Sequence, residues 1–117
     1  NIAFARRCSD MKVDGMALIC HGAGGHTGNL SPFAFSSYVR EFFDGSIVLA
    51  GSISTGSHIK ATKLLNADLC YMGTRFISAT ESNAVDEYKA EAVARVTTNC
   101  TLSILGAVEG SQTRHSI

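Results

Sequence analysis

The sequence predicts an α/β fold with a parallel sheet, and three observations lead to that prediction. Short apolar runs alternate with segments whose apolar residues recur at helical spacing. Each apolar run is followed at once by a loop rich in glycine, serine and threonine. No linker or low-complexity segment interrupts this order over the 117 residues. Alternating strands and helices form parallel sheets, because a helix carries the chain back before the next strand.

The composition excludes several classes of protein. Charged residues make up 17% of the chain, hydrophobic residues 45%, and the formal net charge is 0. These values exclude disorder, coiled coil and collagen, and they give no sign of a nucleic-acid surface. No apolar run approaches the ~20 residues of a membrane span, and no signal peptide is visible. Because the chain begins at Asn1, we expect a cytoplasmic protein whose N-terminal part lies outside this sequence.

The first unit is a helix followed by a strand. Phe4, Cys8 and Met11 lie at i, i+4 and i+7, which predicts an amphipathic helix. The continuous apolar run 15–20 (GMALIC) is typical of a strand buried on both faces. A glycine-rich loop over 21–29 follows it.

The second unit starts where Ser31 and Pro32 form a helix-start signal, with serine as the N-cap. The helix carries an apolar face, and a turn at Asp44 and Gly45 ends it; the face consists of Phe35, Val39 and Phe42. The run 46–50 (SIVLA) predicts a second buried strand, followed by the loop 51–56 (GSISTG).

The third unit is a helix over 57–65, which can bury Ile59, Leu64 and Leu65, and Asn66 can take the left-handed conformation at its end. A strand over 68–73 (DLCYMG) and a loop from Thr74 follow. A last helix is marked by Val85, Tyr88, Ala92 and Val96, with Asp86 and Glu87 in its first turn. The segment 97–117 shows only weak periodicity.

The cysteines predict neither a disulfide framework nor a zinc site. Cys8, Cys20, Cys70 and Cys100 are far apart, and no CxxC occurs. Buried reduced thiols are therefore expected. A zinc site through His21 and His26 lacks a third ligand at a recognisable spacing.

The three loops predict a ligand site, because parallel α/β folds bind ligands at the carboxyl ends of their strands. The first loop, HGAGGHTG, combines four glycines with two histidines. It starts a dinucleotide fingerprint, but Thr27 occupies the third glycine position, so that interpretation is weak. The loop 51–56 opens a helix, and Met72 to Arg75 add a glycine, a hydroxyl and a guanidinium. Consecutive loops of this kind form phosphate sites in barrels, although tight turns explain small residues equally simply.

Five segments together resemble the nitronate monooxygenase family, once called 2-nitropropane dioxygenases. They are HGAGGHTG, LSPFAF, REFFDGSIVLAGSISTG, ADLCYMGTRFISATES and DEYKAEAV. The similarity runs from about residue 3 to 96, and AGGH-x-G and MGTRF are the specific markers. The tail resembles a family segment but carries Ser111, Thr113 and His115 where the family has asparagine, leucine and proline.

The resemblance implies an FMN enzyme on a (β/α)8 TIM barrel, with residues 1–117 forming about the last three strand–helix units of that one domain. It implies that His26 is the catalytic base, acting on a nitroalkane or nitronate with O2. It also implies an FMN site and no metal; the positions that match FMN contacts are Ala23, Gly24, Gly51, Ser52, Met72, Gly73 and Thr74.

Other interpretations stay open. An FMN-dependent enoyl-acyl-carrier-protein reductase of the same superfamily shares the histidine loop and the MGTRF-like loop. A non-catalytic barrel fragment is the third alternative, because three strands cannot close a barrel. Outside the site, His21 is interpreted as a varied loop position, His58 as a solvated helix-start residue and Arg75 as part of an ion pair.

Overall fold

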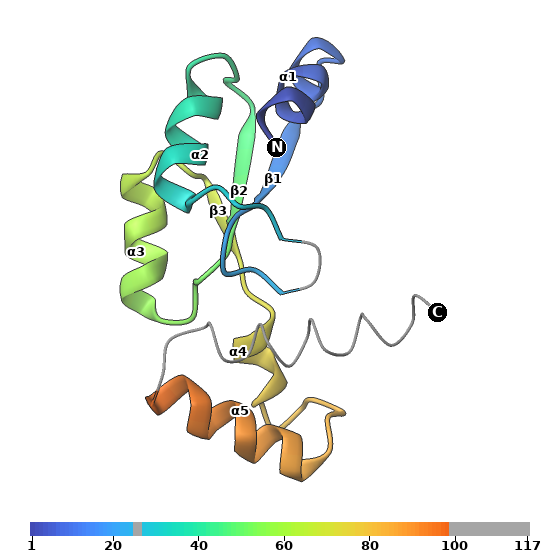
Figure 1. The fold of residues 1–117 in the computed structure, drawn as a ribbon, viewed down its shortest axis with the longest axis vertical. Coiled ribbons are helices and arrows are strands. Elements are labelled where there is room, and N and C mark those ends of the chain that lie inside the picture. The colour runs from blue at the N-terminus through green and yellow to red at the C-terminus, as the bar shows by residue number, and fades with distance from the viewer. Residues whose placement is uncertain (25–26, 99–117) are drawn as a thin grey trace.

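In the computed structural model, residues 1–24 and 27–98 are described, with side chains to residue 94. The helices and strands alternate as predicted (Figure 1). The helices are α1 (Ile2–Asp10), α2 (Pro32–Arg40), α3 (Gly56–Leu64), α4 (Thr74–Ile77) and α5 (Asp86–Thr98). The strands are β1 (Gly15–Ile19), β2 (Ser46–Ala50) and β3 (Leu69–Tyr71). The predicted tail lies beyond the described residues from position 99 onward.

The strands form one parallel sheet in the order β1-β2-β3. Met16 pairs with Ile47, and Leu49 pairs with Cys70. Because all three strands run the same way, their carboxyl ends lie at one edge, on the side of the sheet nearer to α4 and α5 (Figure 1).

The core lies between the sheet and its helices. On β1 and β2 the side chains that face this core are buried, and helix α2 adds Phe35 and Val39 to it; the strand residues are Met16, Leu18, Ile47 and Leu49. Burial of these side chains removes apolar surface from water, which is the main stabilising contribution to such a domain.

The expectation that strand 15–20 is buried on both faces is wrong. Along β1 exposed and buried residues alternate, with Ala17 exposed between Met16 and Leu18. Helices cover one face of the sheet, whereas the opposite face has no described element over it. That opposite face carries Ala17, Val48 and Leu69 in register. Among the described residues, the apolar run of β1 is therefore covered on one face only.

Several predicted core residues also lie at the surface. Leu64 is 84% exposed and Phe4 is 65% exposed, while Thr62 is the buried residue of α3. Helix α2 ends at Arg40, ahead of the predicted turn, so Phe42 follows the helix while still contacting the core. Helical spacing alone identified the helices but not which side of each faces the sheet.

The signals at the ends of two helices were predicted correctly. Ser31 caps α2, and its Oγ accepts a hydrogen bond from Ala34 N at 3.2 Å. Asn66 follows α3 with a φ of 57°, in the left-handed region. These signals act through groups only a few residues apart, which is why the sequence reveals them.

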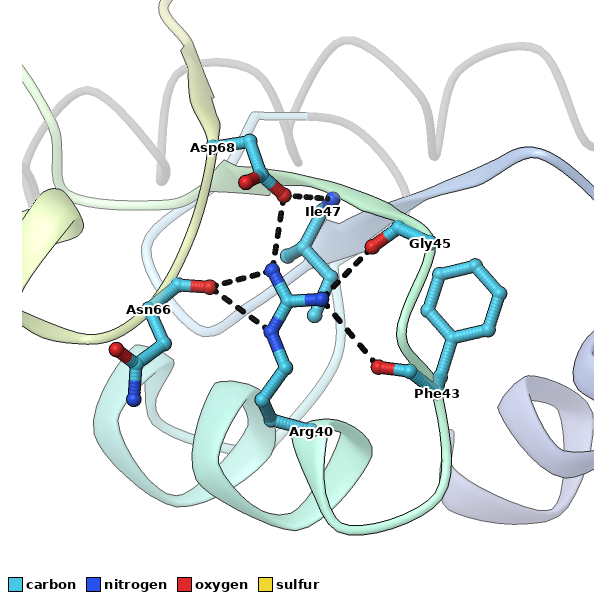
Figure 2. Close-up of polar contacts among 6 residues, drawn as sticks. All are labelled: Arg40, Phe43, Gly45, Ile47, Asn66 and Asp68. Atoms are coloured by element: carbon cyan, nitrogen blue, oxygen red, sulfur yellow. Dashed lines mark hydrogen bonds and ion pairs between the residues drawn. The ribbon is translucent and has the colours of Figure 1, made fainter.

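At the amino ends of β2 and β3, the guanidinium of Arg40 connects three segments (Figure 2). We call this group of residues the Arg40 cluster; its members are Arg40, Phe43, Gly45, Ile47, Asn66 and Asp68. Arg40 Nη1 donates to the carbonyls of Phe43 (3.3 Å) and Gly45 (2.7 Å). Its Nε and Nη2 donate to Asn66 O at 3.0 and 2.6 Å. The Asp68 carboxylate accepts from Arg40 Nη2 at 2.8 Å and from Ile47 N at 2.7 Å. The cluster fixes the segments that enter both strands.

Candidate cofactor site

The three predicted loops leave the sheet at the same edge. Ile19, Ala50 and Tyr71, the last residues of β1, β2 and β3, are paired in one row across the sheet. The loops that follow them therefore start side by side, as expected for a ligand site at the carboxyl ends of parallel strands.

Both sides of the histidine loop are anchored to the end of β1. Thr27 Oγ1 donates to Cys20 O at 2.7 Å, and Ala23 N donates to the same carbonyl at 3.1 Å. His21 N donates to Leu30 O at 2.8 Å. The predicted base, His26, lies outside the described residues, so its role remains a prediction.

The first and second loops are in direct contact. Ser52 N donates to Gly22 O at 3.2 Å, and a Cβ on Gly22 would overlap Ser52 Oγ. Gly51 has a φ of 123°, and a Cβ there would lie 2.7 Å from His21 O. Glycine is therefore required at both positions for the close approach of the two loops. The structure places the predicted residues Gly51 and Ser52 against the base of the histidine loop.

The second loop is hydrogen-bonded to the first turn of α3. Thr55 caps this helix, and its Oγ1 accepts from His58 N at 3.3 Å. The His58 Nδ1 accepts from Ser54 N at 3.1 Å. His58 is exposed, as predicted, but it is also bonded to the loop. Sequence reasoning missed this contact, although the i, i+4 spacing of Ser54 and His58 is a usable signal for it.

The predicted loop from Thr74 is instead a short helix. Residues Thr74–Ile77 form α4, which begins after Gly73, and Phe76 N donates to Gly73 O at 3.0 Å. The strand before it is shorter than the predicted 68–73, which leaves Met72 and Gly73 between β3 and α4. Arg75 forms no ion pair with another described residue. A single helical turn needs only local hydrogen bonds, and periodicity cannot detect so short an element.

Five glycines at this edge fall into two groups. The space around them shows whether a flat, anionic cofactor could approach the backbone. A Cβ on Gly22 or Gly51 would strike the neighbouring loop. In contrast, a Cβ on Gly24, Gly56 or Gly73 would have no atom of the other described segments within 4 Å. One glycine of the second group comes from each loop, so the backbone at all three can be approached closely. This arrangement fits the predicted contacts at Gly24 and Gly73.

Backbone donors accompany these open glycines. The N–H groups of Gly56 and Ser57, in the first turn of α3, donate to no other described residue. Free N–H groups at a helix amino terminus, together with the helix dipole, favour a phosphate or carboxylate. The second loop therefore has the donors that a phosphate group requires.

Metal or thiol chemistry finds no support among the described residues. Nowhere in residues 1–24 and 27–94 do three His, Cys, Asp or Glu side chains gather as a metal would require. Cys8, Cys20 and Cys70 are free thiols, of which only Cys20 is buried. Burial raises the pKa of the Cys20 thiol to about 11, so it is protonated near neutral pH. Cys100 lies outside the described part. No described helix is long and apolar enough to cross a membrane.

The fold is a three-stranded parallel α/β layer whose strand-end loops form a candidate site at one edge. The family model for nitronate monooxygenase matches residues 2–116. The chain therefore belongs to the nitronate monooxygenase family, as the sequence motifs predicted.

The solved structures that are similar to this chain include two of FabK and one of a nitroalkane oxidase. FabK from Thermotoga maritima matches in two forms: the M276A mutant with 27% identity and a TM-score of 0.72, and a second structure with 28% identity and 0.71. These two matches cover 78% and 76% of this chain. The nitroalkane oxidase from Streptomyces ansochromogenes has 28% identity and a TM-score of 0.67 over 74% of this chain. No curated protein gives a match.

These matches place the chain within a larger architecture. It spans 31% of the FabK mutant, 29% of the second FabK structure and 28% of the nitroalkane oxidase. The prediction of a partial TIM barrel is confirmed. The helix-free face of the three-stranded sheet corresponds to the side that a complete barrel closes over.

Proposed function

We propose that this chain contributes the cofactor-binding edge of an FMN-dependent oxidoreductase that oxidises alkyl nitronates with O2 to a carbonyl compound and nitrite. The observation that carries the proposal is the set of three open glycines, one from each strand-end loop, in a member of the nitronate monooxygenase family. A flat cofactor with a phosphate group needs this combination of accessible backbone and free donors.

The proposed FMN contacts are the predicted ones. Gly24 and Ala23 would lie against the flavin, and the second and third loops would hold the phosphate; these loops contribute Gly51, Ser52, Met72, Gly73 and Thr74. FMN, when bound, supplies the electron acceptor for oxidation of the substrate.

His26 is proposed as the base for neutral nitroalkanes. Removing a proton from the carbon next to a nitro group requires a base whose pKa is near the working pH, and a neutral imidazole meets that requirement. A nitronate is already ionised and needs the base less. We therefore expect that His26→Asn lowers turnover of neutral nitroalkanes far more than turnover of nitronates. Equal losses on both substrates would remove His26 from this role.

The test uses the protein expressed from its complete reading frame. Nitrite released from ethyl nitronate in air, without NAD(P)H, supports the proposal. NADH-dependent reduction of a crotonyl thioester without nitrite release would overturn it. The second outcome would identify an enoyl-acyl-carrier-protein reductase, the alternative that the histidine loop and the MGTRF-like loop left open.

The 117 residues alone are proposed to be an incomplete domain. Leu69 is 61% exposed and Tyr71 is 64% exposed on the helix-free face of the sheet. Open sheet edges and an uncovered apolar face promote association. We expect the isolated chain to bind FMN weakly and to self-associate. A yellow, monomeric preparation that unfolds cooperatively would contradict this. The cytoplasmic location expected from the sequence stays a prediction.

A further inference from the structure

The second strand-end loop is closed by a histidine side chain. Ser54 N lies 3.1 Å from His58 Nδ1, and Ser54 Oγ lies 3.5 Å from the same atom. A backbone amide can only donate a hydrogen bond, so Nδ1 must be the acceptor. The ring is then neutral, with its proton on Nε2.

This contact is one of several that hold the loop in place. On the other side of the loop, Ser52 N donates to Gly22 O at 3.2 Å. The loop is thus tied to the histidine loop through Ser52 and to α3 through Ser54. With these two amides engaged, the N–H groups of Gly56 and Ser57 remain among the donors at this end of α3.

We propose that His58 is a positioning residue, which holds the loop 51–56 in the conformation that directs these remaining donors to the phosphate of the cofactor. This inference rests on the proposed function. Without an acceptor at position 58, Ser54 N–H is released and the loop gains conformations. Binding of the phosphate must then order the loop, and this ordering reduces affinity.

The chain offers a matched pair of variants to test this role. In His58→Asn the side-chain oxygen can accept from Ser54 N at nearly the position of Nδ1. In His58→Leu no acceptor remains, although the bulk of the side chain is similar. His58 is exposed and outside the hydrophobic core, so neither substitution removes a core contact.

The experiment compares two probes on the full-length protein. FMN and riboflavin are titrated into the wild type and both variants, with binding followed by quenching of flavin fluorescence. Riboflavin lacks the phosphate and therefore reports any general damage to the flavin site. We expect His58→Leu to weaken FMN binding about five-fold, the effect of one net hydrogen bond, and to leave riboflavin binding unchanged. His58→Asn should stay within about two-fold of the wild type.

Two results would overturn the inference while the proposed function stands. One is equal FMN affinity in the wild type and both variants. The other is a parallel loss of FMN and riboflavin binding in His58→Leu, which indicates a general structural role.

Absence of FMN binding by the wild type would instead overturn the proposed function. Hydrogen exchange of the Ser54 amide then decides the role of His58. Faster exchange in His58→Leu than in the wild type and His58→Asn supports positioning of the loop, and equal exchange in all three proteins overturns it.

Discussion

The two ends of the sheet are built differently, and the difference separates stability from binding. At the amino ends, the Arg40 cluster joins three segments through charged side chains, with contacts between residues up to 28 positions apart (Figure 2). At the carboxyl ends, the segments meet through backbone groups, glycines and hydroxyls. At the amino ends, hydrogen bonds and an ion pair of charged side chains connect the segments. At the carboxyl ends, small residues leave the backbone accessible. In barrels the carboxyl-terminal face carries the active site and the opposite face serves stability.

The largest effect is expected where the carboxyl-end loops touch. Gly51→Ala would place a Cβ 2.7 Å from His21 O in a residue whose φ is 123°. We expect a loss of about 3 kcal/mol in the free energy of unfolding, because backbone atoms cannot move aside cheaply. Urea denaturation of the protein expressed from its complete reading frame measures this loss. The control is Gly73→Ala, which meets no atom within 4 Å and should change stability by less than about 0.5 kcal/mol. Equal losses in both would mean that the loops do not depend on close contact.

The next largest effect is expected at the amino ends of the strands. Arg40→Met removes the guanidinium that serves Phe43, Gly45, Asn66 and Asp68. We expect a loss of about 2 kcal/mol in the same urea experiment, since hydrogen bonds to charged groups contribute more than neutral ones. Arg75→Met is the matched control near the carboxyl end and should change stability by less than about 0.5 kcal/mol. Equal losses in the free energy of unfolding for Arg40→Met and Arg75→Met would contradict the contrast between the two ends.

A smaller effect appears as a dependence of stability on pH. The hydrogen bond from Ile47 N, and after it that from Arg40, lowers the pKa of Asp68 below its usual 3.8. A carboxyl group with a lowered folded pKa stabilises the fold above its unfolded pKa, and this contribution is lost as pH falls through the folded pKa. The urea midpoint of the wild type should therefore decrease as pH falls below about 4. Asp68→Asn should flatten that decrease.

Glu81 provides the comparison for Asp68. Its pKa is also lowered, first by its own backbone N–H and then by the Thr80 hydroxyl. These partners are adjacent in the chain, so the unfolded chain can form the same contacts, and the pKa of Glu81 then differs little between the folded and unfolded states. Glu81→Gln should therefore leave the pH dependence below pH 4 nearly as in the wild type. A flattening as large as that of Asp68→Asn would contradict the contrast.

The smallest effect compares one substitution at both ends. Ser52 and Asn66 have φ values of 55° and 57°, in the left-handed region that favours glycine. Ser52→Gly should raise the free energy of unfolding by about 0.5 kcal/mol. Asn66→Gly should have a smaller effect, because asparagine tolerates this conformation better than serine. Thermal unfolding measures the stability change of both variants. A larger increase in stability for Asn66→Gly than for Ser52→Gly would contradict the expected order.

The sequence predicted most of the fold because its signals are local. The order of strands and helices, the Ser31 cap and the left-handed Asn66 depend on neighbours within a few residues. The errors have two causes. Exposure of Phe4 and Leu64, the one-sided burial of β1 and the helix α4 depend on which segments lie beside them or on bonds too short-ranged to leave a periodicity.

The sequence by itself determined the family, the parallel α/β order and the loops that form the candidate site, because motif spacing and apolar periodicity are written along the chain. Only the tertiary structure decided how these loops meet. It paired Gly22 with Ser52, and it gathered three open glycines at one edge. It also placed Arg40 against Asp68 at the opposite end. Such contacts depend on distances between folded segments, and residue spacing along a chain does not specify those distances.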